Sequence, residues 1–335
     1  MPNHMTRVLG RSGIEVSALG LGCWAVGGPW TINGSQAGWS VVDDNESSRA
    51  IQRALELGVN FFDTAANYGA GHSERLLGKI FKGRRDQVVI ATKFGYQVDE
   101  AAKEVLNYDG KEEDSDVASR VRTDAEASLK RLDTDYIDVY QLHVWGLGIE
   151  RALQARDVLE DLVREGKIRT YGWSTDRTDA IKAFSTSPNC SVVQQQLSVL
   201  DGNMELLALC EQLNLASINR GPLGMGLLTG KFAPESTFAA DDVRHNANWH
   251  PGFKNGKPTQ EWLDKLAAIH DVLTSNGRTL SQGALAWIWA RSPQTVPIPG
   301  FKTVAQVEEN CKALQFGPLD SGQMAEIDQI LGRTS

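Results

Sequence analysis

Residues 58–93 of the chain read GVNFFDTAANYGAGHSERLLGKIFKGRRDQVVIATK. Asn60–Asp63 and Val88–Lys93 are short runs rich in aromatic and β-branched residues, which is typical of buried strands. Between them, Ser73–Phe81 carries apolar residues at helical spacing, which predicts an amphipathic helix. A strand, a helix and a second strand in this order are typical of a parallel sheet whose strands are connected through helices.

The same alternation continues along the 335-residue chain and gives eight strand–helix units. The predicted strands are Ala18–Gly22, Asn60–Asp63, Val88–Lys93, Ile137–Leu142, Ile168–Trp173, Ser191–Gln196, Ala216–Asn219 and Thr295–Pro297. The predicted helices are Glu46–Leu57, Ser73–Phe81, Asp116–Leu132, Ile149–Arg164, Thr178–Ser185, Met204–Leu213, Gln260–Ser275 and Val304–Leu314. No linker-like composition divides the series, so we expect one α/β domain over residues 1–335, a (β/α)8 TIM barrel. A doubly wound sheet is the competing architecture.

Two segments lie outside the eight units. Arg7–Val16 reads as two short strands around a Gly-containing turn, which predicts an N-terminal β-hairpin that plugs the bottom of the barrel. Asp320–Leu331 predicts an extra C-terminal helix.

Three connections are too long to be plain turns, and each follows a predicted strand. They are Cys23–Asn45, Phe94–Ser115 and Lys231–Thr259. In a barrel all three would rise from the carboxyl ends of the strands, where active sites are built. We expect the first connection, with Trp24, Trp30 and Trp39, to supply apolar walls. The middle one, rich in Asp, Glu and Lys, is expected to be a solvated insertion.

The composition argues against several classes of protein. The 34 Lys and Arg against 42 Asp and Glu give a net charge of −8, which disfavours a nucleic-acid-binding or membrane-binding surface. No apolar run approaches the roughly 20 residues that span a bilayer, and no export signal is visible, so we expect a cytoplasmic protein. The four cysteines form no CxxC and the six histidines no HxH or HExxH, so we expect no metal. The oligomeric state is left open.

Four polar residues stand at or just beyond the ends of consecutive predicted strands. Asp63 ends the second strand, and Tyr68 lies five residues further on. Lys93 ends the third strand, and His143 follows the fourth. Because the carboxyl ends of barrel strands meet at one rim, we expect these side chains to converge. Taken singly, each also has a structural explanation, as a helix cap, a packing ring, a solvated cation or a buried imidazole.

Together the four would form an acid site for an oxygen that gains negative charge. A Tyr hydroxyl, with a pKa of about 10, keeps its proton at neutral pH and can donate it. The ammonium of Lys93 would stabilise the phenolate and so lower the pKa of Tyr68. Asp63 would hold that ammonium, and a neutral His143 could donate a hydrogen bond to a carbonyl oxygen.

These residues also carry a family resemblance. Gly58–Gly69, Ala91–Gly95 and Gln141–His143 resemble the Asp, Tyr, Lys and His motifs of the aldo-keto reductases. The resemblance runs from about Arg7 to the final helix. It implies an eight-stranded α/β barrel that reduces aldehydes or ketones with NADPH and needs no metal.

The resemblance also implies a role for each catalytic candidate. Tyr68 would be the general acid and Lys93 would tune it. Asp63 would order Lys93, and His143 would orient the carbonyl group of a small-molecule substrate.

The eighth unit is the strongest cofactor signal in the residues themselves. The chain has neither a GxGxxG between a strand and a helix nor a P-loop, so the Rossmann fingerprint is absent. Gly300 would permit close backbone approach before a helix N-terminus, and Lys302 would add a positive charge for a phosphate. The same residues could be an ordinary helix start.

The family's cofactor contacts extend this prediction to NADP(H). The 2′-phosphate and adenine contacts fall on Gly300, Lys302, Thr303, Gln306, Glu309 and Asn310. The contacts to the nicotinamide amide fall on Ser174 and Gln194, the backbone contacts on Gly221, Pro222 and Leu223, and the pyrophosphate contact on Lys231. Trp24 and Asp63 would lie beside the nicotinamide.

Two positions depart from the family pattern. Arg220 stands where an aromatic side chain commonly stacks on the nicotinamide ring, and Thr175 replaces a frequent Asn after Ser174. A guanidinium can stack, but it brings charge near a ring that becomes cationic on oxidation. This would shift cofactor affinity or redox direction.

Three functions compete. The first is a reductase in which Tyr68 protonates the carbonyl oxygen. The second is a regulatory or scaffold subunit that binds NADP(H) with little turnover. The third is a metal-dependent barrel hydrolase or isomerase, which the histidine pattern does not support. Sugars, aromatic aldehydes, cyclic ketones and pyridoxal-like compounds all fit the sequence as substrates.

Overall fold

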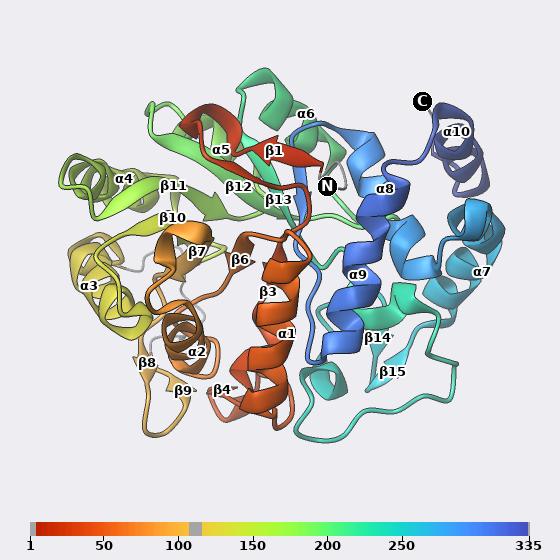
Figure 1. Ribbon diagram of the computed structural model, residues 1–335, viewed down its shortest axis with the longest axis horizontal. Helices are drawn as coiled ribbons and strands as arrows, with labels where there is room; N and C mark the ends of the chain where they lie inside the picture. The colour runs from red at the N-terminus through yellow and green to blue at the C-terminus, as the bar shows by residue number, and fades with distance from the viewer. Residues whose placement is uncertain (1–4, 107–115, 334–335) are drawn as a thin grey trace.

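Eight parallel strands form a closed barrel at the centre of the molecule (Figure 1). The structure is a computed structural model and describes residues 5–106 and 116–333. The strands, in order around the barrel and along the chain, are β3 (Leu21–Gly22), β6 (Phe61–Asp63), β7 (Val89–Phe94), β10 (Ile137–Leu142), β11 (Ile168–Ser174), β12 (Cys190–Gln196), β13 (Ala216–Arg220) and β16 (Thr295–Pro297). The barrel closes because the Gly20 amide donates to the Pro297 carbonyl at 3.0 Å and the Gly22 amide donates to the Pro299 carbonyl at 3.1 Å. The barrel prediction is confirmed, and the doubly wound sheet is excluded.

Helices surround the barrel in the described part of the chain. They are α1 (Asp44–Glu56), α2 (His72–Phe81), α3 (Val121–Leu132), α4 (Ile149–Arg164), α5 (Thr178–Phe184), α6 (Met204–Gln212), α7 (Gln260–Thr274), α8 (Leu280–Arg291), α9 (Val304–Phe316) and α10 (Ser321–Ile330). Their starts follow local chemistry: the Asp43 carboxylate caps α1, and Thr279 and Gln282 form a capping box at α8. α10 confirms the expected C-terminal helix.

The sequence analysis missed α8, which packs against β16 and α9. It assigned α7 as the helix of the seventh unit, whereas α7 precedes α8 and packs beside it. Every residue from Ser281 to Trp289 is buried. A helix covered on all sides has no polar stripe, so its sequence lacks the amphipathic period by which helices are recognised.

Two further element boundaries differ from the prediction by more than two residues. Only Leu21 and Gly22 of the predicted first strand are strand. The preceding Gly20 instead approaches Phe61 closely, since an added Cβ would lie 2.5 Å from that ring. The helix predicted from Asp116 begins at Val121, after a 3-10 turn.

The amino end of the barrel is plugged by an apolar hairpin. β1 (Thr6–Val8) pairs antiparallel with β2 (Glu15–Ser17). Leu9, Ile14 and Val16 from this hairpin are buried in one cluster with barrel side chains that include Phe61, Val139 and Val192. The plug therefore closes this end of the barrel with packed apolar groups, as the sequence predicted.

The first two long connections are joined by a small sheet above the opposite end. It contains β4 (Thr31–Ile32), β5 (Ser35–Gln36), β8 (Val98–Asp99) and β9 (Glu104–Val105) in the order β5-β4-β9-β8. The expected solvated insertion holds for the turn at residues 100–103, which is exposed, but β9 pairs with β4 and Val105 is buried, so the described part of the middle connection is also anchored in a sheet. The rest of that connection, residues 107–115, lies outside the described residues.

The third long connection contains another short hairpin, β14 (Phe253–Lys254) with β15 (Lys257–Pro258). None of the helices in residues 5–106 and 116–333 has the length and apolar character needed to cross a membrane.

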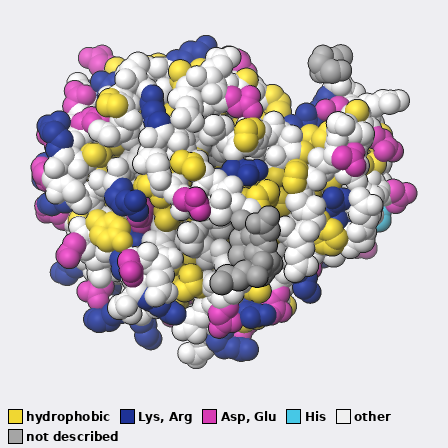
Figure 2. All heavy atoms as spheres, turned by 45° about the horizontal axis from the view of Figure 1, so that its top comes forward, with side chains coloured by type: hydrophobic (Ala, Val, Ile, Leu, Met, Phe, Trp, Pro, Cys, Tyr) yellow, Lys and Arg dark blue, Asp and Glu magenta, His cyan; other side chains and the backbone are white. Residues whose placement is uncertain are grey.

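On the face drawn in Figure 2, the basic and acidic side chains are interspersed, and neither sign of charge forms a separate patch.

Candidate active site

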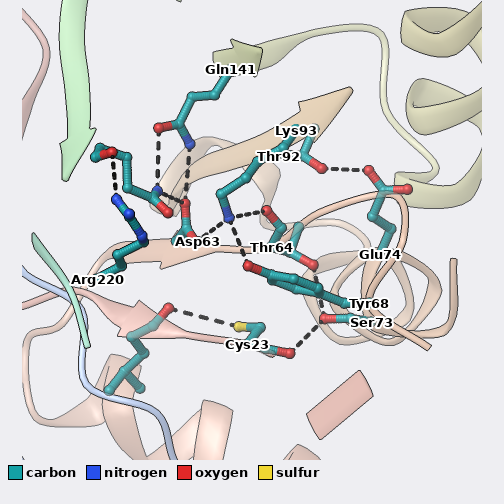
Figure 3. Close-up of polar contacts among 12 residues, drawn as sticks. Cys23, Asp63, Thr64, Tyr68, Ser73, Glu74, Thr92, Lys93, Gln141 and Arg220 are labelled. Atoms are coloured by element: carbon teal, nitrogen blue, oxygen red, sulfur yellow. Dashed lines mark hydrogen bonds and ion pairs between the residues drawn. The ribbon is translucent and has the colours of Figure 1, made fainter. Parts of the chain in front are cut away.

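The four predicted catalytic side chains meet at the carboxyl end of the barrel, and Figure 3 shows three of them, Asp63, Tyr68 and Lys93. Lys93 on β7 donates from Nζ to Asp63 Oδ1 at 2.5 Å and to the Tyr68 hydroxyl at 3.1 Å. The same ammonium donates to the Thr64 carbonyl at 2.9 Å. The His143 ring, just beyond β10, lies edge-on to the Tyr68 ring, with 6.0 Å between the centroids. Strand-end positions that are 80 residues apart in sequence therefore surround one hydroxyl.

Both carboxylate oxygens of Asp63 accept hydrogen bonds, although the residue is only 1% exposed. Its Oδ2 accepts hydrogen bonds from Gln141 Nε2 at 3.1 Å and from Gln194 Nε2 at 2.7 Å. The sequence analysis did not assign the support from Gln141. Because side chains alternate along a strand, Gln141 shares the inward face with His143, and this spacing was the available signal.

Burial controls the pKa values of the site. Burial raises the pKa of Tyr68, and the opposing charge of Lys93 does not reverse the shift. Desolvation lowers the pKa of Lys93, but Asp63 and Tyr68 outweigh it and raise that pKa. Burial lowers the pKa of His143 well below its usual value, and Lys93 and Arg220 lower it further. At neutral pH the site thus holds a phenol, an ammonium and an uncharged imidazole.

The upward shift in the pKa of Tyr68 corrects the expectation, made from the sequence, that Lys93 would lower it. That expectation counted the charge of Lys93 and left out desolvation, which depends on tertiary burial. Lys93 still lowers the cost of forming the phenolate relative to the same buried site without a cation.

Aromatic rings form a wall beside the Tyr68 hydroxyl. Trp24 stacks on Tyr68 at 6.2 Å, and Tyr96 lies 5.5 Å from the His143 ring. Trp24 is held by a hydrogen bond from Nε1 to the Ala37 carbonyl and by edge contact with Trp39. The first two connections therefore supply an apolar surface next to the proton donor.

A cavity of about 810 Å³ opens at this end of the barrel. The predicted cofactor residues that line it are Trp24, Asp63, Ser174, Gln194, Arg220, Gly221, Pro222, Leu223, Lys231, Gly300, Lys302, Gln306, Glu309 and Asn310. Thr303 is not among the lining residues, because its side chain caps α9 by accepting from the Gln306 amide at 3.3 Å. Tyr68 and His143 line the cavity, and Lys93 lies behind them, fully buried.

Positive charge gathers in another part of the cavity lining, where Lys231, Arg244 and Lys302 come from two different connections. Arg244 pairs with Asp242 at 2.6 Å and lies over the Trp39 ring. Desolvation and the charge of Arg244 lower the pKa values of both lysines, which Asp242 only partly offsets. Cations crowded in this way favour an anionic ligand.

Arg244 and Asp242 were missed by the sequence analysis. They lie in the middle of the long third connection, in a stretch with no regular period, and only the tertiary fold brings them to the cavity. No chemical signature in the local sequence marks them.

No cluster of three or more His, Cys, Asp or Glu side chains that could hold a metal ion occurs within residues 5–106 and 116–333.

Comparison with known proteins agrees with this geometry. The model of the aldo/keto reductase family matches residues 18–332. This chain belongs to the aldo/keto reductase family. Among curated proteins it is 32% identical over 329 residues to the aldo-keto reductase YhdN of Bacillus subtilis, covering 96% of this chain and 92% of that protein. It is 30% identical to yakc of Schizosaccharomyces pombe, an aldo-keto reductase named for NADP(+), covering 92% of this chain and 86% of the relative.

Solved structures of aldo/keto reductases have the same fold. The glycerol dehydrogenase AKR11B4 of Gluconobacter oxydans superposes with a TM-score of 0.80 at 28% identity, over 99% of this chain and 96% of that one. The family resemblance of the Asp, Tyr, Lys and His motifs is therefore confirmed at the level of fold and family.

Proposed function

We propose that this aldo/keto reductase reduces an aldehyde or ketone with NADPH, and that Tyr68 donates the proton to the carbonyl oxygen. The observation that carries the proposal is the Tyr68 hydroxyl, 3.1 Å from the Lys93 ammonium, at the edge of a cavity whose lining also contains a cluster of cations. This combination suits a neutral reacting group and a phosphate-bearing cofactor in one continuous space.

The residues present fit NADP(H). Lys231, Arg244 and Lys302 offer more positive charge than Asp242 neutralises. Within the described residues, the buried Trp30 Nε1 and Trp39 Nε1 line the cavity without a hydrogen-bond partner. Unpaired buried donors beside a cationic cluster suit a large polar ligand. The yeast relative named for NADP(+) supports the same cofactor.

When bound, NADPH supplies a hydride, with its two electrons, to the carbonyl carbon. Tyr68 gives the carbonyl oxygen its proton, and Lys93 stabilises the phenolate that remains. Asp63 holds the ammonium, while the neutral His143 can donate a hydrogen bond to the same carbonyl oxygen. Solvent then returns a proton to Tyr68. Trp24 excludes water from one side of the phenol ring.

We assign cofactor contacts to the cavity residues that the sequence predicted. Ser174 and Gln194 would hold the nicotinamide amide. Because the side-chain NH2 of Gln194 already donates to Asp63 and Gln141, its side-chain oxygen would accept from the cofactor amide. Gly221, Pro222 and Leu223 would contact the cofactor through the backbone. Lys231 and Lys302 would meet the phosphates, while Thr303 would act only through the helix cap.

Substitution of Tyr68 by Phe tests the assignment. We expect kcat to fall about 10²–10⁴-fold, because a positioned general acid contributes a factor of this size. The Kd for NADPH, measured by protein fluorescence, should change little. Tyr136→Phe is the matched control, since Tyr136 packs under Arg85, far from the cavity, and should retain full activity. Wild-type activity in Tyr68→Phe would exclude Tyr68 as the acid.

A panel of carbonyl compounds and alcohols separates the reductase from a regulatory subunit. Turnover of any carbonyl with NADPH supports the reductase. Tight NADPH binding by the wild type with no turnover across sugars, aromatic aldehydes, cyclic ketones and pyridoxal-like compounds would favour the regulatory role. Retention of turnover in a chelator would exclude a metal-dependent reaction.

A proposal about the domain organisation, partners and location of the enzyme completes the proposed function. We propose that residues 1–335 act as one domain on a small-molecule substrate, without nucleic acid as a partner, and that they do so in the cytoplasm. Burial raises the pKa of each of the four free thiols, Cys23, Cys190, Cys210 and Cys311. Unpaired cysteines of this kind suit a reducing compartment.

A further inference from the structure

Arg220 and Asp176 form an ion pair at the carboxyl ends of β11 and β13. Arg220 is the last residue of β13 and lines the cavity. Its Nη2 pairs with Asp176 Oδ2, and its Nη1 donates to the main-chain carbonyl of Gln194 at 3.0 Å. Asp176 is fixed in turn, because its Oδ1 accepts a hydrogen bond from the main-chain NH of Gln196 at 2.7 Å. Arg220 is therefore held in a fixed position in the cavity wall by a partner that does not itself line the cavity.

Arg220 lies within electrostatic reach of the reacting groups (Figure 3). Gln194, whose carbonyl accepts from Arg220, donates from its side chain to Asp63, and Asp63 holds Lys93. Burial is the largest influence on the pKa values of Tyr68 and His143, and the charge of Arg220 lowers both. A charged group placed next to Tyr68 would experience the same field.

We propose that the Arg220–Asp176 pair sets the relative affinity of the cavity for the two redox forms of the cofactor, with Arg220 favouring the reduced form. The inference rests on the proposed use of NADP(H). Hydride transfer requires the nicotinamide ring and the carbonyl carbon to be in contact, so the ring must come close to the Tyr68 hydroxyl.

The two redox forms differ in the charge that Arg220 would meet. The reduced ring is uncharged, and it becomes cationic when its hydride passes to the carbonyl carbon and Tyr68 protonates the oxygen. The phosphates are the same in both forms. Arg220 repels the cationic ring, whereas Asp176 attracts it and partly cancels that repulsion. Because Arg220 lines the cavity and Asp176 does not, the net effect is weaker binding of the oxidised cofactor, which favours its release after carbonyl reduction.

The two members of the pair should act in opposite directions, which gives a sharp experiment. Kd values for NADPH and NADP+ are measured by fluorescence titration for the wild type, Arg220→Gln and Asp176→Asn. The ratio Kd(NADP+)/Kd(NADPH) should fall about three- to tenfold in Arg220→Gln, the size expected for a partly screened charge at an effective dielectric constant near 20. It should rise in Asp176→Asn, in which the amide oxygen can still accept from the Gln196 amide.

Lys231→Gln is the matched control, because it removes a cation from the part of the cavity assigned to the phosphates. Both Kd values should rise together and leave the ratio unchanged. Circular dichroism and thermal melting test whether each variant is folded. If Arg220→Gln does not fold, the direction in which the ratio Kd(NADP+)/Kd(NADPH) changes in Asp176→Asn decides whether the inference stands.

The outcomes distinguish this inference from the proposed function. A ratio that stays at the wild-type value in both variants, or moves in the same direction in both, would overturn the inference while leaving the reductase assignment intact. A wild-type protein that binds neither redox form would overturn the proposed function, and the inference with it.

Discussion

Two buried carboxylates, Asp63 and Asp138, show how one type of interaction serves different purposes at the two ends of the barrel. Both lie on barrel strands, are at most 1% exposed and pair with cations. Asp138 accepts from Arg85, Arg169 and the Ile90 amide, and all its partners are structural. The cation of Asp63 also donates to a titratable hydroxyl beside a cavity. An ion pair becomes chemically useful when its cation has such a neighbour.

The largest effect is expected from Lys93→Met. Loss of the ammonium should lower kcat by at least about 10²-fold, because the phenolate loses its stabilising charge. It should also lower the free energy of unfolding by about 3–5 kcal/mol, since Asp63 is left as an uncompensated buried charge. Steady-state kinetics and denaturant unfolding measure the two effects. Adding Asp63→Asn should restore stability without restoring kcat, and recovery of both would contradict the catalytic assignment.

Asp138→Asn tests whether the other buried carboxylate contributes to stability alone. We expect a loss of about 3 kcal/mol in the free energy of unfolding, because Arg85 is left largely buried without its partner. The kcat of the folded protein should equal that of the wild type. Urea unfolding and kinetics at a temperature well below the midpoint test this. A large fall in kcat with normal stability would show that the two carboxylates are not functionally distinct.

His250, a buried residue in the cavity lining, should make the stability of the protein depend on pH. His250 is 3% exposed, its Nδ1 accepts from the Gly252 amide, and burial lowers its pKa to about 4. The unfolded chain therefore binds a proton below about pH 6.5 that the folded chain does not bind until near pH 4. His250 alone should lower the free energy of unfolding by about 3 kcal/mol as the pH drops through this window.

His250→Gln should remove the share of that pH dependence that comes from His250, because glutamine does not titrate. Urea unfolding at several pH values between 4 and 7 measures it. The depressed pKa of His143 acts in the same direction, so a residual slope should remain in the variant. A wild-type slope of opposite sign would contradict the assignment of His250 as a buried neutral imidazole.

The smallest effect is expected for Lys302→Gln. Lys302 contacts the Ser40 carbonyl at 3.3 Å and forms no ion pair among the described residues, unlike Arg85 at the other end. Its loss should therefore leave stability unchanged but raise the Kd for NADPH about tenfold, the size of one charge-assisted contact. The Kd for NADH should change much less. Equal changes for both cofactors would place Lys302 away from the 2′-phosphate.

The sequence predicted those features that depend on local pattern. The barrel followed from repeated strand and helix periods, and the positions of Tyr68 and Lys93 followed from where strands end. What it missed depends on tertiary burial. α8 has no polar face to reveal it, Arg244 reaches the cavity from an irregular connection, and the upward shift in the pKa of Tyr68 arises from desolvation.

The pairing of β4 with β9 constrains any attempt to redesign substrate preference. The connection that carries Trp24 and the connection that carries Tyr96 share backbone hydrogen bonds, so neither can be exchanged alone without exposing a sheet edge. A chimera that takes both segments from one donor protein should keep this strand pairing intact. A chimera that takes them from two donors would have to pair unrelated strands at Thr31–Ile32 and Glu104–Val105.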